Sequence, residues 1–283
     1  MTRYVYRLLN VFGIEGDPFS GNPLCVFEDA RGLSDRTMQA LALQFNLSET
    51  TFLLPSAIGD ARVRIFTPTF EMQFAGHPTL GSAHVVKTLH QTADELRLEL
   101  NIGLVPVSAS PARRYTLQAQ SAKTRAVRAS PGQLAAMLGL SERDLAPEPL
   151  WVDTGTDQLL VPLASAEAVA RCQPDAREME RHASVRDGRY TVYVFADAGA
   201  EQVSARCFFK TTSHVEDPAT GSACANLAGY LLARGTPTPF TRRVAQGAEV
   251  ARPSQLELRV DAERRIFVSG SVHELGSGAI ELA

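Results

Sequence analysis

The sequence predicts an α+β protein of two similar halves, in which each half is rich in strands and contains one strongly apolar helix. Short apolar runs bounded by Gly, Pro, Asn and Ser recur along the 283 residues, a pattern typical of strands joined by turns. Two segments, 77–90 and 217–234, are long and apolar enough to form buried helices. Because the openings of these two helices match and lie half a chain apart, the sequence indicates a duplicated unit.

The first half begins with two strand-like runs, 4–12 and 23–29, which are separated by the turn-forming sequence GDPFSGNP. A helix is expected over 34–46, because Ser34 is a favoured N-cap residue and apolar residues mark one side of the segment. Further strands are expected before and after the apolar helix, and the alternation of polar and apolar residues is clearest in ARVRIF. These strands cover 48–55, 61–68, 95–103, 104–110 and 114–120.

A change in composition around 121–131 separates the halves, so we expect one domain over 1–122 and a second over 123–270. The Ser-Pro pair at 130–131 opens a helix that is expected to run to 145. The rest of the second half alternates between strand-like and helical patterns. It contains a strand-turn-strand over 151–163, helical pieces over 165–183 broken by Pro174, strands at 190–196 and 203–210, and a hairpin over 256–272.

The openings of the two apolar helices form an internal repeat. Residues 77–83 (HPTLGSA) align without gaps with residues 217–223 (DPATGSA), and four of the seven positions are identical. Proline is favoured at the first helical position, which predicts that His77 and Asp217 are the N-cap residues. The outward N–H groups and the helix dipole make such an end favourable for an anion, so we expect it to suit a carboxylate ligand.

The helix expected from 217 onward is apolar on nearly all sides, which indicates a buried helix rather than an amphipathic one. A strand-rich half wrapped around one buried helix is a closed or nearly closed barrel, and two such barrels would place two helix N-termini at a shared cleft. The small residues at 81–83 and 221–223 would let other backbone, or a ligand, approach each helix closely.

Several polar residues have both an ordinary and a functional interpretation. Asp217 could simply cap a helix, whereas His77 has no such role and its ordinary pKa near 6.5 suits proton exchange. Glu49 by itself resembles a surface charge. The other interpretations from the residues are structural: Glu71, Glu216 and His214 as structural or solvent-facing groups, His84, His90, His182 and His273 without metal-ligand spacing, and Cys224 as a small core residue.

Composition argues against several classes of function. The net charge is −3 and Lys and Arg are scattered, so no nucleic-acid surface is indicated. The four cysteines show no C-x-x-C pair, which argues against a disulfide scaffold or a zinc site and favours reduced thiols. No signal-peptide core and no apolar run of about 18 residues is evident. We therefore expect a cytoplasmic protein that binds neither nucleic acid nor membranes.

Five stretches, taken in order, resemble the phenazine-biosynthesis PhzF-like isomerases, which share the diaminopimelate-epimerase fold. They are GNPLCVF at 21–27, the glutamate in LSETTF, FAGHPTLGSA at 74–83, EDPATGSA at 216–223, and QG and RPS within 246–254. The resemblance spans nearly the whole chain. It implies two pseudo-symmetric antiparallel β-barrel domains, each around a central helix, with the first domain completed by a segment near 270–283. It also implies a homodimer, an active site in the cleft between the domains, and no metal or organic cofactor.

The same resemblance implies roles for individual residues. Glu49 would remove a proton from one ring carbon of a substrate similar to 2,3-dihydro-3-hydroxyanthranilate and return it at another carbon, giving a keto tautomer. His77 and Asp217 would hydrogen-bond the substrate's amino or hydroxyl group and assist protonation. The substrate's carboxylate would be held by the backbone N–H groups of Gly76, Gly221 and Ser222.

Two alternatives stay open. The epimerase relatives use two cysteines, one at each helix N-terminus, and this sequence has no thiol at either position, because Cys224 lies too far into the second helix. An epimerase or racemase would therefore have to pair Glu49, His77 and Asp217 differently. The other alternative is a non-catalytic ligand-binding or interaction protein. The physiological substrate is not determined by the sequence.

Overall fold

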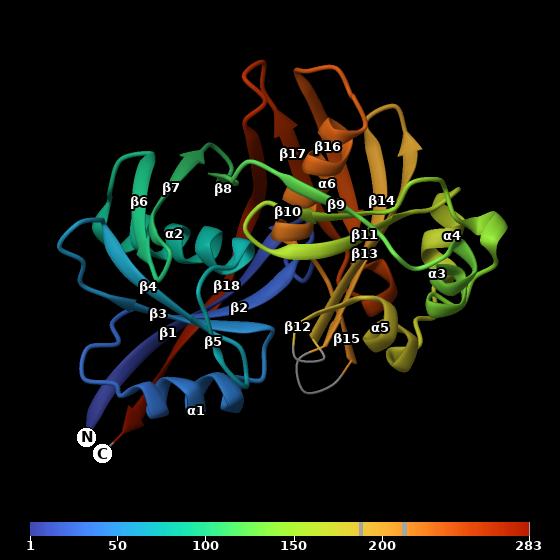
Figure 1. Cartoon of the computed structure of the whole chain (residues 1–283). Coiled ribbons are helices and arrows are strands. Elements are labelled where there is room, and N and C mark those ends of the chain that lie inside the picture. Colours follow the sequence, from blue (N-terminus) through green and yellow to red (C-terminus); the bar gives the residue numbers. More distant parts are fainter. Residues whose placement is uncertain (187–188, 211–213, 283) are drawn as a thin grey trace. The chain divides into compact units, whose positions relative to one another are not determined.

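The computed structural model describes residues 1–186, 189–210 and 214–282, and it is a sheet-dominated α+β fold with few helices (Figure 1). The described chain divides into two compact units. The first contains residues 1–118 and the C-terminal stretch from Ser269, and the second contains Ala119–Val268. Each unit is described separately below.

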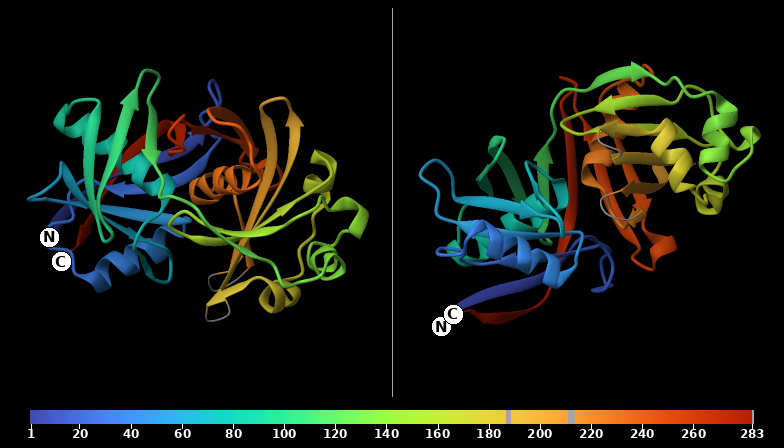
Figure 2. Two further views of the ribbon diagram at one scale, coloured as in Figure 1. Left: turned by 45° about the horizontal axis from the view of Figure 1, so that its top comes forward. Right: turned by 60° about the horizontal axis from the view of Figure 1, so that its bottom comes forward.

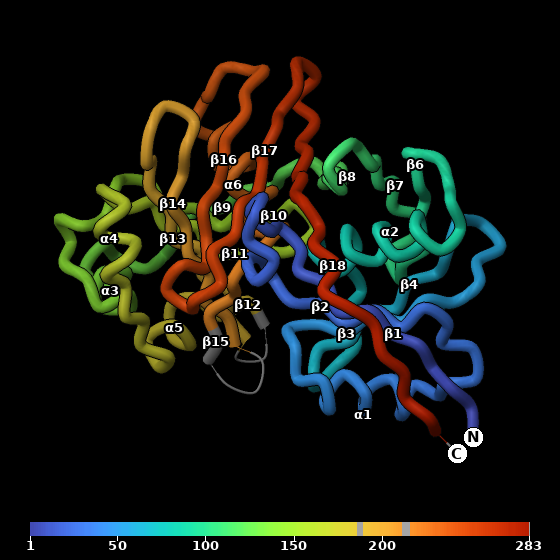
Figure 3. Tube along the Cα trace, turned by 180° about the vertical axis from the view of Figure 1, so that it is seen from behind, coloured from blue at the N-terminus to red at the C-terminus, as the bar shows by residue number. Residues whose placement is uncertain are grey.

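In the first unit, β1 (Thr2–Gly13) pairs in antiparallel fashion with β2 (Asn22–Phe27) and with the C-terminal strand β18 (Ile266–Leu282). Figure 3 shows β1 and β18 running side by side, which brings the two ends of the chain together. The C-terminal stretch is therefore part of the first unit's sheet. The other strands are β3 (Glu49–Leu54), β4 (Ala61–Phe66), β5 (Glu71–Met72), β6 (Glu95–Leu100), β7 (Gly103–Ser110) and β8 (Arg114–Gln118).

Helix α1 (Asp35–Phe45) confirms the helix expected over 34–46. The Ser34 hydroxyl accepts a hydrogen bond from the Thr37 N–H at 3.1 Å, and Asn46 ends the helix in the left-handed conformation. The buried side of α1 packs on an aromatic cluster that includes Phe27 and Phe52. Local capping and one apolar stripe are sufficient to define this helix.

Helix α2 (Gly76–His90) is the core helix of the first unit, and every residue from Gly76 to Val86 is buried. It lies very close to β1 and β2 at Gly81, where an added Cβ would come within 2.4 Å of Leu24 Cδ2 and 3.1 Å of Val11 Cγ2. Only glycine fits without a shift of these neighbours, which confirms the close approach expected at the small residues.

The strands of the second unit form a continuous series in which β9, β10, β11, β13, β14, β16 and β17 pair in that order. The strand β15 also pairs with β14. The bounds are β9 (Lys123–Ala126), β10 (Leu150–Asp153), β11 (Asp157–Pro162), β12 (Ser184–Arg186), β13 (Arg189–Gly199), β14 (Gln202–Lys210), β15 (His214–Asp217), β16 (Phe240–Gln246) and β17 (Ser254–Val260).

Three short helices of the second unit pack together on one part of its sheet (Figure 2). They are α3 (Pro131–Met137), α4 (Ala166–Arg171) and α5 (Ala176–His182), accompanied by the 3-10 turns η1 (Glu142–Asp144) and η2 (Ala248–Val250). The break between α4 and α5 confirms the interruption expected at Pro174. The expected helix over 130–145 is too long, because Gly139 takes a left-handed backbone conformation (φ 68°) and stops α3.

Helix α6 (Gly221–Ala233) is the core helix of the second unit and is buried over most of its length. Cys224 is fully buried within it, which confirms its interpretation as a core residue. Asn226 is the polar exception, since its side chain accepts from the Thr154 N–H at 2.8 Å and donates to the Gln158 side chain at 2.7 Å. This buried amide fixes the position of α6 against the β10–β11 turn.

The N-cap positions expected for His77 and Asp217 are wrong. Helix α2 starts at Gly76, so His77 lies inside its first turn, and the residue at the N-cap is Ala75. Helix α6 starts only at Gly221 with Thr220 at the N-cap, and Asp217 is the last residue of β15. A proline fits the first helical turn in α2, whereas Pro218 holds Asp217 in an extended conformation. The two matching sequences therefore start their helices at different positions: α2 starts before its proline, and α6 starts three residues after its proline.

Candidate active site

Glu49 and His77 meet in the first unit, although they belong to different elements. Glu49 is the first residue of β3, and His77 lies in the first turn of α2. The Nε2 atom of His77 is 3.4 Å from Oε2 of Glu49, and the two side chains are 6% and 15% exposed. The structure therefore joins two of the three predicted catalytic residues in one largely buried pair.

The imidazole of His77 is also hydrogen-bonded to the backbone of Pro23. Proline has no N–H, so the ring must donate to the Pro23 carbonyl. Since Nε2 faces Glu49 and has no hydrogen-bond partner among the described residues, the donating atom is Nδ1. Burial lowers the pKa of His77 to about 3, and the bond to Pro23 opposes this only in part. His77 is neutral at pH 7, and its unprotonated Nε2 lies 3.4 Å from Oε2 of Glu49.

Strand register and one buried hydrogen bond bring these groups together. Strands β2 and β3 are parallel, with Leu24 opposite Glu49, which places the Pro23 carbonyl beside the start of β3. On the other side, the Ser82 hydroxyl donates to the Thr51 hydroxyl at 2.9 Å and ties α2 to β3. The first turn of α2 is thereby held against the end of β3 that carries Glu49.

Asp217, the third predicted catalytic residue, lies in the second unit and is 8% exposed. Its Oδ2 atom accepts a hydrogen bond from the Thr220 hydroxyl at 2.6 Å. Strand β15 places it opposite Cys207 of β14. A carboxylate held in this way at the end of a strand can accept a hydrogen bond from an amino or hydroxyl group.

The three residues predicted to bind a carboxylate through their backbone all begin a core helix. Gly76 is the first residue of α2, and Gly221 and Ser222 are the first two residues of α6. The N–H groups of a first helical turn have no acceptor within the helix, and the helix dipole adds partial positive charge there. The Ser222 hydroxyl accepts a hydrogen bond from the Gln158 side chain at 3.2 Å.

Two residues interpreted as structural or solvent-facing are engaged in ion pairs. Glu216 accepts two hydrogen bonds from Arg206, at 2.9 and 2.7 Å, and Glu71 accepts two from Arg64, at 2.8 and 2.6 Å. The side chain of His214 lies outside the described residues. Both glutamates are therefore structural anchors.

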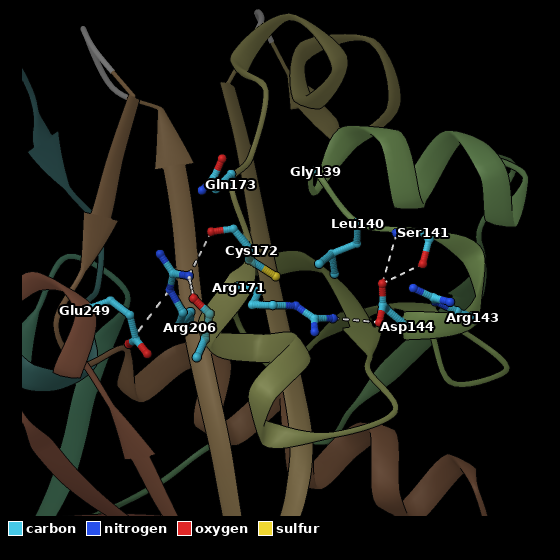
Figure 4. A pocket seen from close by; sticks show the side chains of 11 residues that line it. Gly139, Leu140, Ser141, Arg143, Asp144, Arg171, Cys172, Gln173, Arg206 and Glu249 are labelled. Atoms are coloured by element: carbon cyan, nitrogen blue, oxygen red, sulfur yellow. Dashed lines mark hydrogen bonds and ion pairs between the residues drawn. The ribbon is translucent and has the colours of Figure 1, made fainter.

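A cavity of about 760 Å³ in the second unit contains none of the predicted site residues. Figure 4 shows that Arg171 and Arg206 project into it and that each is already paired. Arg171 donates to Asp144 at 2.7 Å, and Arg206 donates to the Cys172 carbonyl at 2.9 Å. Arg171 and Arg206, two of the three arginines that line the cavity, thus hold the ends of α4 and η1.

Sequence reasoning missed two partners of the predicted residues, Pro23 and Thr220. Both stand inside motifs that the sequence displays, GNPLCVF and EDPATGSA. Every residue has a backbone carbonyl, and threonine hydroxyls are common, so only the fold identifies the roles of Pro23 and Thr220.

Within the described residues, no helix has both the length and the apolar character to cross a membrane. In that same part of the chain, no three His, Cys, Asp or Glu side chains are grouped to hold a metal ion.

The chain is similar to known proteins over nearly its whole length. The family model of the phenazine biosynthesis-like proteins matches residues 11–275. An uncharacterised isomerase of Pasteurella multocida is 38% identical over 99% of this chain and 95% of its own length. A trans-2,3-dihydro-3-hydroxyanthranilate isomerase of Pseudomonas aeruginosa is 36% identical over 97% of both chains. A crystal structure of a PhzF-family protein from Bacillus anthracis superposes with a TM-score of 0.87 at 22% identity, covering both chains completely.

Both of these curated relatives are named isomerases, and the family match supports the same class for this chain. The chain belongs to the phenazine biosynthesis-like family. This confirms the resemblance drawn from the five sequence motifs.

Proposed function

We propose that this protein is a cofactor-independent isomerase that moves a proton between two carbons of a small carboxylate substrate, with Glu49 as the group that carries the proton. The substrate class is that of trans-2,3-dihydro-3-hydroxyanthranilate, on which the Pseudomonas aeruginosa relative is named. The observation that supports this proposal most directly is the pairing of Glu49 with a buried, neutral His77.

The chemistry follows from the hydrogen-bonding state of His77. Its Nδ1–H donates to the Pro23 carbonyl, so its Nε2 can accept a hydrogen bond from the O–H of a protonated Glu49. A carboxyl group that has just taken a proton from carbon is therefore stabilised by an existing acceptor. The neutral imidazole does not take the proton away, because burial disfavours the imidazolium.

In the proposed reaction, the Glu49 carboxylate removes a proton from one ring carbon and the double bonds shift. The protonated Glu49 then returns the same proton to another carbon, so the product is an isomer and the enzyme is regenerated. Asp217 is assigned to hydrogen-bond the substrate's amino or hydroxyl group. The first-turn N–H groups of Gly76, Gly221 and Ser222 are assigned to its carboxylate.

The test follows hydrogen exchange at carbon by NMR, with dihydro-hydroxyanthranilate and other small carboxylates in deuterated buffer. Glu49→Gln should lower exchange and turnover by about 100-fold or more while the protein stays folded. Glu15→Gln, at an exposed glutamate, is the matched control and should leave both unchanged. Full exchange in Glu49→Gln would reject Glu49 as the proton carrier. Exchange confined to an α-carbon would instead favour an epimerase.

The two-barrel architecture, the homodimer and the cytoplasmic location belong to the same proposal. The barrel is supported in the first unit by the surroundings of α2, which contacts β1, β2, β3, β4, β6, β7 and β8. The homodimer and the location follow from the family resemblance and from the composition. Light scattering on the purified protein tests the dimer, and a mass of one chain would reject it.

A further inference from the structure

Gln246, at the end of β16, is a buried side chain for which the reaction described above has no role. It is 3% exposed, and it begins the QG pair that forms part of the fifth sequence motif. All of its polar atoms are directed at the segment that joins Asp217 to α6. Its Nε2 donates to the Asp217 carbonyl at 2.7 Å and to the Thr220 hydroxyl at 3.0 Å, and its Oε1 accepts from the Thr220 N–H at 3.3 Å.

These bonds determine the direction of the Thr220 hydroxyl. A hydroxyl has one proton to donate and can accept through its oxygen. The Thr220 oxygen accepts from Gln246, so its single proton is available for Asp217, whose Oδ2 lies 2.6 Å away. Thr220 occupies the N-cap of α6 but makes no side-chain cap bond. The Thr220 side chain therefore donates to the Asp217 carboxylate and does not cap α6.

Gly247 explains why Gln246 can reach this segment. The backbone there has φ 84°, and an added Cβ would lie 2.5 Å from the Pro218 carbonyl oxygen and 2.3 Å from the Arg252 carbonyl oxygen. The chain after Gln246 thus lies directly against Pro218. Glycine provides both the left-handed conformation and the close approach.

We propose that Gln246 and Thr220 are positioning residues that hold the Asp217 carboxylate in one orientation for substrate, with Gln246 acting through the Thr220 hydroxyl. This inference rests on the role of Asp217 in the proposed isomerase reaction. A charge-assisted hydrogen bond of this length restricts the rotation of a carboxylate, and the buried amide of Gln246 holds the hydroxyl that makes this bond.

The experiment measures kcat and KM for wild type and for Thr220→Val, Thr220→Ser, Gln246→Leu and Asp217→Asn, with thermal unfolding to confirm folding. Thr220→Val and Gln246→Leu should each lower kcat by about 10- to 100-fold. Thr220→Ser keeps the hydroxyl and should restore most of the rate. In the Asp217→Asn background, Thr220→Val should cause little further loss, because the group that it positions is already changed.

Three outcomes overturn the inference in different ways. Equal losses from Thr220→Val in both backgrounds would mean that Thr220 does not act through Asp217. Full activity of Thr220→Val and Gln246→Leu beside a damaged Asp217→Asn would reject the positioning role alone. Full activity of Asp217→Asn beside an inactive Glu49→Gln would reject the role of Asp217 in the proposed function, and the inference with it.

Discussion

His77 Nε2 lies 3.4 Å from Glu49 Oε2, while the opposite nitrogen of the same ring is hydrogen-bonded to the Pro23 backbone carbonyl. The imidazole is therefore hydrogen-bonded to β2 through one nitrogen and lies beside the first residue of β3 with the other. Burial keeps this ring neutral at pH 7, so the stability of the folded protein should depend on pH.

We predict that the free energy of unfolding decreases as the pH falls below about 6.5, the ordinary pKa of a histidine in an unfolded chain. The pKa of His77 in the folded protein is about 3. Between these values the unfolded chain binds a proton that the folded protein excludes, so acid favours unfolding. This one group contributes a slope of up to about 1.4 kcal/mol per pH unit. Above about pH 6.5 it contributes none.

Chemical denaturation at several pH values between about 4.5 and 7.5 measures this slope. His77→Gln should flatten it, and His90→Gln, at an exposed histidine, should not. Burial also lowers the pKa of His84, so part of the slope persists in both variants. An unchanged slope in His77→Gln would mean that His77 binds its proton equally well in the folded and unfolded protein, and would contradict the prediction.

Gly81→Ala should destabilise the first unit by about 1–3 kcal/mol, because the new methyl group would overlap Leu24 in a filled core. Gly276→Ala is the matched control, since no heavy atom lies within 4 Å of a Cβ added there. Urea unfolding of the two variants compares the costs. Equal stability of the two would show that α2 can move away from β2 at no cost.

Gly247 and Gly16 have almost the same left-handed backbone, with φ 84° and 83°, but only Gly247 is in close contact with other backbone. Alanine at either site introduces conformational strain, so the difference between the two variants measures the contact alone. Gly247→Ala should be less stable than Gly16→Ala by at least about 1 kcal/mol. It should also lower kcat, because Gln246 would be displaced from Thr220. Gly16→Ala should leave the rate unchanged.

Arg206→Met should cost about 3 kcal/mol or more, because it leaves the largely buried Glu216 carboxylate without the cation that balances its charge. Adding Glu216→Leu should recover part of this loss, since an apolar pair no longer buries a single charge. The exposed pair of Arg31 and Asp29 provides the comparison, and Arg31→Met should change stability little. Thermal unfolding of the four proteins checks the order. A double variant less stable than Arg206→Met would contradict the argument.

Much of the secondary structure follows from local patterns. Ser34 and Asn46 bound α1 as expected, and Pro174 separates α4 from α5. These features depend on residues only a few positions apart, which cap or interrupt a helix in any context. The expected N-caps at His77 and Asp217 were wrong because a local match does not determine where a helix starts. The repeat shows that the segments are alike, but the start of each helix depends on whether the preceding strand continues through the proline.

The sequence by itself determined the family, the two core helices and the residue types available for proton transfer. Motifs and apolar patterns depend on residues that are close together in the sequence, so they can be recognised without the structure. Only the tertiary structure decided which of these residues meet. Glu49 lies beside His77 because the Ser82–Thr51 hydrogen bond holds α2 against β3, and Gln246 reaches Thr220 because Gly247 lets the chain lie against Pro218. Such contacts join distant segments, and they depend on register, burial and close packing, which no short stretch of sequence specifies.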